Sequence, residues 1–167
     1  IYTLSLHDAL PISTSALRTI GEIGRSKTAE AVRRGLLESC RLVQSEARAR
    51  HQFTSRTGVL ERSIEYRLER GSLVGVVKIS DAAPYGVFVH EPTGIYGPTK
   101  ERYQIRPKRK QALRWAADGK LHFARLVNHP GSPADRFLYE AADRSRERIR
   151  KIFARHIQKA IQSGKGG

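Results

Sequence analysis

The sequence predicts an α+β fold, in which an antiparallel β-sheet of two hairpins plus a central strand is packed by a long N-terminal and a long C-terminal helix. Apolar residues recur at helical spacing near both ends of the chain. Between them, short segments alternate apolar and polar residues and are joined by turn-forming residues. The first pattern is typical of amphipathic helices and the second of half-buried strands. With 167 residues the chain has the length of one domain and can bury a core.

The N-terminal helix is predicted from residues 29–47, where apolar residues recur every three or four positions and so share one face. We expect this helix to begin near Thr14 or Thr28 and to end near His51. Gly35 interrupts the pattern at a cost of about 1 kcal/mol relative to alanine. It therefore indicates a close approach of another backbone.

Residues 1–13 lack the basic region with which a signal peptide begins. They resemble translated sequencing-adapter read-through. We therefore expect 1–13 to be a non-native extension and 14–167 to form a single domain.

The first hairpin is predicted from residues 64–68, which alternate apolar and charged residues, and residues 73–79, which are rich in valine. Gly71-Ser72 lies between them and suits a turn. Residues 85–91 follow with Tyr85 at their start and are predicted to form the central strand.

The second hairpin is centred on Asp118-Gly119, a dipeptide typical of two-residue hairpin turns. Its strands are expected at 112–116 and 120–127. Before it, residues 92–102 contain two glycines and two prolines and are predicted to be an exposed loop, and 103–106 a short strand.

A proline-bracketed turn is predicted to lead into the C-terminal helix. Pro130 ends the preceding strand, and Gly131 can adopt a positive φ. Ser132 is then expected as the N-cap and Pro133 as the first helical residue. Asp135, three residues after the cap, completes an arrangement like a capping box.

The apolar positions of these elements give a candidate core. The closing helix is expected to continue to about residue 162, with Phe137 and Leu138 at the start of its apolar stripe. We expect Phe137 and Trp115 to lie in the core or in a subunit contact rather than in a ligand pocket. Cys40 belongs to the first apolar stripe and is expected to be a core residue.

The net charge of +15 points to acidic partners. Residues 100–125 hold nine basic residues against two acidic ones. Their densest cluster consists of Arg106, Lys108, Arg109 and Lys110. We expect this cluster to contact an acidic partner. No interleaved aromatic residues, recognition helix or zinc-finger spacing accompanies this cluster, so specific nucleic-acid binding is not predicted.

Other functional classes lack their signatures. A single cysteine excludes an internal disulfide and a zinc site with two thiolates. No stretch approaches the roughly 18 uncharged apolar residues of a membrane span, so we expect no membrane partner.

Catalytic and metal sites are not predicted either. His90 and Glu91 are adjacent in a predicted strand and would point to opposite faces. His122 and His129 have no second metal ligand at a useful spacing. Gly119-Lys120 lacks the preceding glycine of a phosphate-binding loop. We therefore expect a non-enzymatic protein without a cofactor.

Four short motifs follow one another along the chain. They are Thr57-Gly58-x-Leu60-x-x-Ser63, the segment from Tyr85 to Glu91, Pro107 followed by Ala112-Leu113-x-Trp115, and His129-Pro130-Gly131 followed by Arg136-Phe137-Leu138. In this order, over residues 28–161, they resemble the tail-component, or neck and tail-completion, proteins of long-tailed bacteriophages. The chain departs from the pattern where Glu91-Pro92-Thr93-Gly94 replaces the Glu-x-Gly-Thr order.

The resemblance implies a small α+β subunit without catalytic residues that joins a ring, six-fold when assembled, between the head connector and the tail tube. Its partners would be further copies of itself, head-connector proteins and tail-tube proteins. It would be found in the virion neck or tail, and in the host cytoplasm during assembly. The alternative that the charge leaves open is a basic nucleic-acid-binding protein that works alone.

Overall fold

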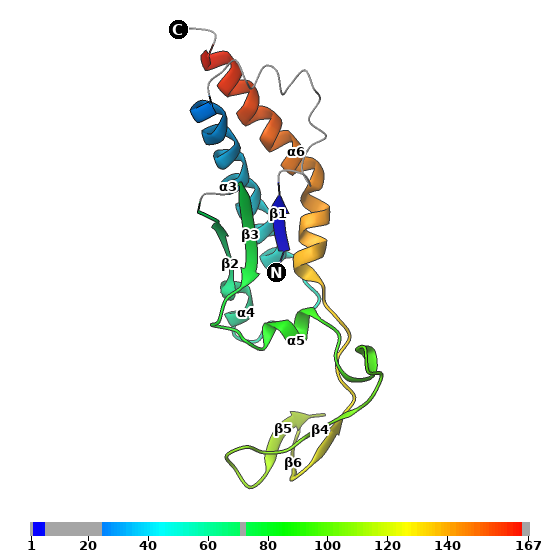
Figure 1. Cartoon of the computed structure of the whole chain (residues 1–167). Helices are drawn as coiled ribbons and strands as arrows, with labels where there is room; N and C mark the ends of the chain where they lie inside the picture. The colour runs from blue at the N-terminus through cyan, green and yellow to red at the C-terminus, as the bar shows by residue number, and fades with distance from the viewer. Residues whose placement is uncertain (1, 6–24, 71–72, 165–167) are drawn as a thin grey trace. The chain divides into compact units, whose positions relative to one another are not determined.

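The computed structural model describes residues 2–5, 25–70 and 73–164 (Figure 1). The chain divides into two compact units. Unit 1 consists of Ile1–Pro84 and Arg136–Gly167, and unit 2 of Tyr85–Asp135. That residues 14–167 form one domain stays a prediction.

Two long helices make up the larger part of the described residues of unit 1. α3 (Arg25–Ala49) and α6 (Phe137–Gly164) lie side by side (Figure 1). The predicted α+β fold with packed N-terminal and C-terminal helices is therefore confirmed. The facing stripes of the two helices hold most of the core, with buried apolar residues Ala31, Val32, Leu36, Cys40, Val43, Ala47, Phe137, Leu138, Ala141, Ala142, Ile149, Ile152 and Phe153.

Gly35 marks a close approach of the two helices. A Cβ added at Gly35 would lie 2.9 Å from the ring Cδ1 of Phe153. The approaching group is thus a side chain and not the backbone that the sequence indicated. Cys40 is fully buried, as predicted, and burial raises the pKa of its thiol to about 11.

A three-stranded antiparallel sheet completes unit 1, with strand order β1-β3-β2. β2 (Ile64–Leu68) and β3 (Val74–Ile79) form the first predicted hairpin, and α3 packs against both of them. The predicted turn at 71–72 lies outside the described residues. β1 (Tyr2–Ser5) pairs with β3 from within the segment 1–13, whose non-native origin stays a prediction.

Unit 2 begins with a short helix, α5 (Gly86–His90), so the predicted central strand at 85–91 is wrong. The Glu91 N–H donates to the Val87 carbonyl at 2.8 Å, which is a helical bond. Over five residues, a composition of valine and aromatic residues does not decide between strand and helix. Val87 and Phe88 are both exposed, so the alternation that suggested a strand corresponds to no buried face.

The rest of unit 2 consists of two small antiparallel sheets and a 3₁₀ turn, η1 (Gly94–Tyr96). β4 (Tyr103–Ile105) pairs with β7 (Val127–His129), and β5 (Leu113–Ala117) pairs with β6 (Lys120–Ala124). The second predicted hairpin is therefore confirmed, except that its second strand ends at Ala124 and Val127 pairs with β4 instead. The described strands form three separate sheets and not the single predicted sheet.

The C-terminal helix begins at Phe137, four residues after the predicted start at Pro133, so the assignment of Ser132 as its N-cap is wrong. Ser132 instead binds Thr93. Its N–H donates to the Thr93 Oγ1 at 2.9 Å, and its carbonyl accepts the Thr93 N–H at 2.9 Å. Because both backbone groups of Ser132 are used in this contact, the segment stays outside the helix.

Candidate interaction surface

Buried and exposed apolar side chains are divided unevenly between the units. All eighteen buried apolar residues of the described chain belong to unit 1. Unit 2 contributes ten of the twelve exposed large apolar residues, namely Tyr85, Val87, Phe88, Ile95, Tyr96, Tyr103, Trp115, Leu121, Phe123 and Leu126. In its described residues, unit 2 thus presents apolar surface without an apolar core of its own.

The outer face of the β5–β6 hairpin is the centre of this surface. The turn has positive φ at both Asp118 and Gly119, as a type I′ turn requires, and it fixes the register. Arg114 lies opposite Phe123 and Ala116 opposite Leu121, and opposite residues share a face of the ribbon. Phe123 is 64% exposed and Leu121 is 57% exposed. We call Arg114, Ala116, Leu121 and Phe123 the hairpin outer face.

The other face of the hairpin is half covered. Trp115 lies opposite His122, and their rings stack with centroids 5.4 Å apart. Trp115 remains 39% exposed, so its placement in the core of the chain is wrong. A two-stranded ribbon has no second layer to bury a large ring, which is why its periodic position did not lead to burial. Its part in a subunit contact stays a prediction.

A basic rim, which we define as Lys108, Arg109 and Lys110, lies next to the hairpin outer face. Lys108, Arg109 and Lys110 line a shallow hollow of about 870 Å³ together with Arg114, Phe123, Pro107, Ala112 and Leu113. Arg106 does not line the hollow, and its guanidinium contacts the Gln104 Oε1 at 3.5 Å. The structure therefore brings three of the four predicted basic residues together. It adds Arg114 and Phe123, which the sequence reading missed although the Asp118-Gly119 register would have placed them opposite each other.

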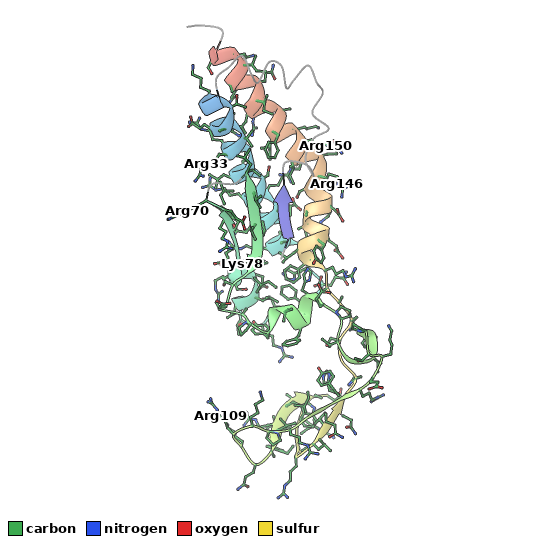
Figure 2. All side chains as sticks on the ribbon, in the orientation of Figure 1. Arg33, Arg70, Lys78, Arg109, Arg146 and Arg150 are labelled. Carbon is green, nitrogen blue, oxygen red and sulfur yellow. The ribbon has the colours of Figure 1, made fainter. Side chains whose placement is uncertain are left out.

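The positive charge of unit 2 is uncompensated. None of its nine lysines and arginines forms an ion pair with an acidic residue in the described chain. On the long helices, by contrast, arginines pair with neighbouring carboxylates, as Arg148 does with Glu46 at 2.8 Å. Figure 2 shows Arg109 on the segment before β5, and Arg146 and Arg150 on α6, where both arginines form ion pairs.

The motif around Gly131 joins two segments of unit 2, residues 93–95 and residues 130–132. Gly131 has a φ of 93°, as predicted, and a Cβ added there would collide with the Thr93 carbonyl. The Ile95 N–H donates to the Pro130 carbonyl at 2.8 Å, and the Gly131 N–H donates to the His129 Nδ1 at 2.9 Å. These residues clamp the segment 93–95 against 130–132.

The remaining motif residues serve packing in unit 1. Gly58, with a φ of 66°, precedes α4 (Val59–Ser63). Leu60 and Ser63 are buried, and the Ser63 hydroxyl donates to the Leu60 carbonyl at 2.6 Å. The carbonyl of Thr57 accepts a hydrogen bond from Arg62 at 2.9 Å. Phe137 and Leu138 are buried in the core, as predicted for Phe137.

His90 and Glu91 are in contact, so the prediction that they point to opposite faces is wrong. The segment is helical up to His90, and the His90 Nδ1 lies 3.0 Å from the Glu91 Oε1. Burial lowers the pKa of His90, and Glu91 opposes this shift. Because His90 is buried, the pair offers no open site to a substrate.

The part of the chain that the structure describes holds neither a cluster of metal ligands nor a helix that could cross a membrane. Over residues 2–5, 25–70 and 73–164, no three histidine, cysteine, aspartate or glutamate side chains are grouped so that they could hold a metal ion. No helix in this same part of the chain is long and apolar enough to cross a membrane.

No protein-family model, curated protein or solved structure matches the chain. The resemblance to the phage tail-component family therefore rests on the four motifs. In the structure, the first motif and Arg136-Phe137-Leu138 lie in unit 1, and the other motif residues lie in unit 2.

Proposed function

We propose that the protein is a non-enzymatic structural subunit of the head–tail junction of a tailed bacteriophage, in the neck or tail-completion ring. The observation that carries this proposal is that unit 2 exposes ten large apolar residues and buries none in the described chain. Extensive exposed apolar surface is typical of protein contact sites. A small unit without a core gains stability when a neighbour covers it. The order of the four motifs supports the choice of family.

In this function the neighbours are further copies in a ring, hexameric when assembled, and the head-connector and tail-tube proteins. The protein is assembled in the host cytoplasm and remains in the virion. Unit 1 supplies a rigid core, and unit 2 supplies the surface that neighbours cover.

Deleting the gene from its phage tests the proposal. Electron microscopy of the lysate is expected to show filled heads beside unjoined or defective tails. Supplying the gene in trans should restore infectious particles. Normal infectious particles from the deletion phage would contradict the proposal.

The alternative is a nucleic-acid-binding protein that works alone. Four cations beside an exposed phenylalanine favour it, because aromatic rings stack on bases and cations bind phosphates. A salt titration separates the two functions. A phosphate-binding monomer loses affinity with a log–log slope of about 0.9 per phosphate contact on duplex DNA, whereas a junction subunit should bind DNA little as a monomer.

A further inference from the structure

We infer that the hairpin outer face and the basic rim form one docking surface for an acidic protein other than a copy of this chain, with apolar side chains at the centre of the contact and carboxylates around them. The surface consists of Ala116, Leu121 and Phe123, bordered by Lys108, Arg109, Lys110 and Arg114. The inference rests on the proposed function, in which unit 2 contacts neighbouring proteins, and it specifies the chemistry of one such neighbour.

The centre of the surface calls for an apolar partner. Leu121 and Phe123 are among the most exposed large apolar side chains of the described chain, and both lie on the same face of one ribbon. A phosphate backbone offers little apolar area to cover them, and a leucine has no ring on which a base could stack. A protein surface with apolar side chains would cover both Leu121 and Phe123.

The basic residues of this surface favour carboxylates on the partner. Lys108, Arg109, Lys110 and Arg114 line the hollow, and no acidic residue lines it with them. None of the four has an acidic partner in the described chain. Complementary charge on the partner would orient the contact and speed the encounter.

A second copy of the chain is poorly suited to this surface. Each copy carries a net charge of +15. All six acidic residues of α3 and α6 already form ion pairs within the chain, so these helices offer no uncompensated acidic patch. The net charge of each copy and this pairing therefore favour a different, acidic protein as the partner.

The test measures binding of two synthetic peptides to the full chain at physiological ionic strength. One peptide alternates glutamate and leucine, and the other alternates glutamate and serine with the same charge. Trp115 is the only tryptophan and lies on this hairpin, so its fluorescence reports binding. The glutamate–leucine peptide should bind about tenfold more tightly than the glutamate–serine peptide, because it also covers apolar area.

Two variants separate the contributions of the apolar and the basic residues to binding. Phe123→Ser should weaken binding of the glutamate–leucine peptide about tenfold and leave the affinity for the glutamate–serine peptide unchanged. Arg109→Gln should weaken both peptides. The matched controls are Leu73→Ser and Arg33→Gln, which replace exposed residues of unit 1 and should change neither affinity.

Equal affinity for the two peptides, or an unchanged affinity in Phe123→Ser, would overturn the inference. Tighter binding of an oligothymidylate of matched charge than of either peptide would overturn it in favour of nucleic acid. The peptide assay uses isolated protein, and the gene deletion examines particles. If the deletion phage gave normal particles and the peptides still showed the expected selectivity, the proposed virion function would be contradicted and the docking surface would be supported.

Discussion

Gly131 lies where two backbone segments of unit 2 approach each other closely. Its φ of 93° disfavours any residue with a β-carbon, and the Thr93 carbonyl occupies the space that a Cβ would need. Gly131→Ala should therefore lower the stability of unit 2 by about 2 kcal/mol or more, as seen in thermal unfolding followed by Trp115 fluorescence. Gly119→Ala is the control, because Gly119 also has a positive φ but has no atom within 4 Å of an added Cβ. Equal losses in the two variants would show that the contact with Thr93 adds nothing.

The same substitution should change stability by very different amounts at two phenylalanines. Phe137 is fully buried and meets the ring of Phe53 edge to face, with centroids 5.3 Å apart. Phe137→Ala should lower the free energy of unfolding by about 3–5 kcal/mol. Phe123→Ala, at a site that is 64% exposed, should change it by less than about 0.5 kcal/mol. Urea denaturation followed by circular dichroism measures both, and a loss below about 1 kcal/mol at Phe137 would contradict its place in the core.

Helices α3 and α6 are joined by an ionic contact as well as by their apolar stripes. Glu38 of α3 pairs with Arg155 of α6 and with the His156 Nε2 at 2.8 Å. The hydrogen bond from Arg155, followed by that from His156, holds the pKa of Glu38 below its usual value. The site is partly exposed, so solvent screening limits its contribution to stability.

The lowered pKa sets the pH range in which this contact stabilises the fold. A carboxyl whose pKa is depressed by folding contributes stability above its unfolded pKa, and that contribution is lost as pH falls through its folded pKa. Glu38→Gln should therefore cost up to about 1 kcal/mol at neutral pH and nothing once the carboxyl is protonated. Thermal unfolding of both proteins between neutral and acidic pH measures the difference. Asp143→Asn, which breaks an ion pair within α6 only, is the control, and a constant difference for Glu38→Gln across this range would contradict the prediction.

Elements with long periodic patterns could be predicted from the sequence, and short ones could not. α3 and α6 follow apolar stripes of many turns, and the Asp118-Gly119 turn determines its own hairpin. α5 spans five residues, so its identity depends on hydrogen bonds rather than on a pattern. The late start of α6 has a similar cause, since Ser132 binds Thr93, a partner 39 residues away that local rules do not reveal.

Only the basic part of the candidate surface could be predicted from the sequence, because the apolar part depends on contacts between residues that are distant along the chain. Lys108, Arg109 and Lys110 are neighbours along the chain, so their charge could be read directly. Phe123 comes next to them only because the hairpin turns back at Asp118-Gly119 and places it opposite Arg114. Residues that are neighbours along the chain can be recognised as a cluster from the sequence alone. Residues that strand pairing brings together can be recognised as a cluster only after the register of the strands is known.

Across the chain as a whole, the division of apolar burial predicts two separate unfolding transitions. Unit 1 holds every buried apolar residue of the described chain, while unit 2 is held by backbone hydrogen bonds and two-stranded sheets. Such sheets are marginally stable in the absence of a covering layer. Unit 2 should therefore unfold first in the isolated protein.

Two probes can follow the units separately. Trp115 fluorescence reports unit 2, and far-ultraviolet circular dichroism is dominated by α3 and α6 of unit 1. The fluorescence midpoint is expected to lie about 5 °C or more below the dichroism midpoint. Gly131→Ala should lower only the fluorescence midpoint, and Phe137→Ala should lower the dichroism midpoint. Coincident transitions that both variants shift together would mean that the chain unfolds as one cooperative domain, and that unit 2 is stable without a neighbour to cover it.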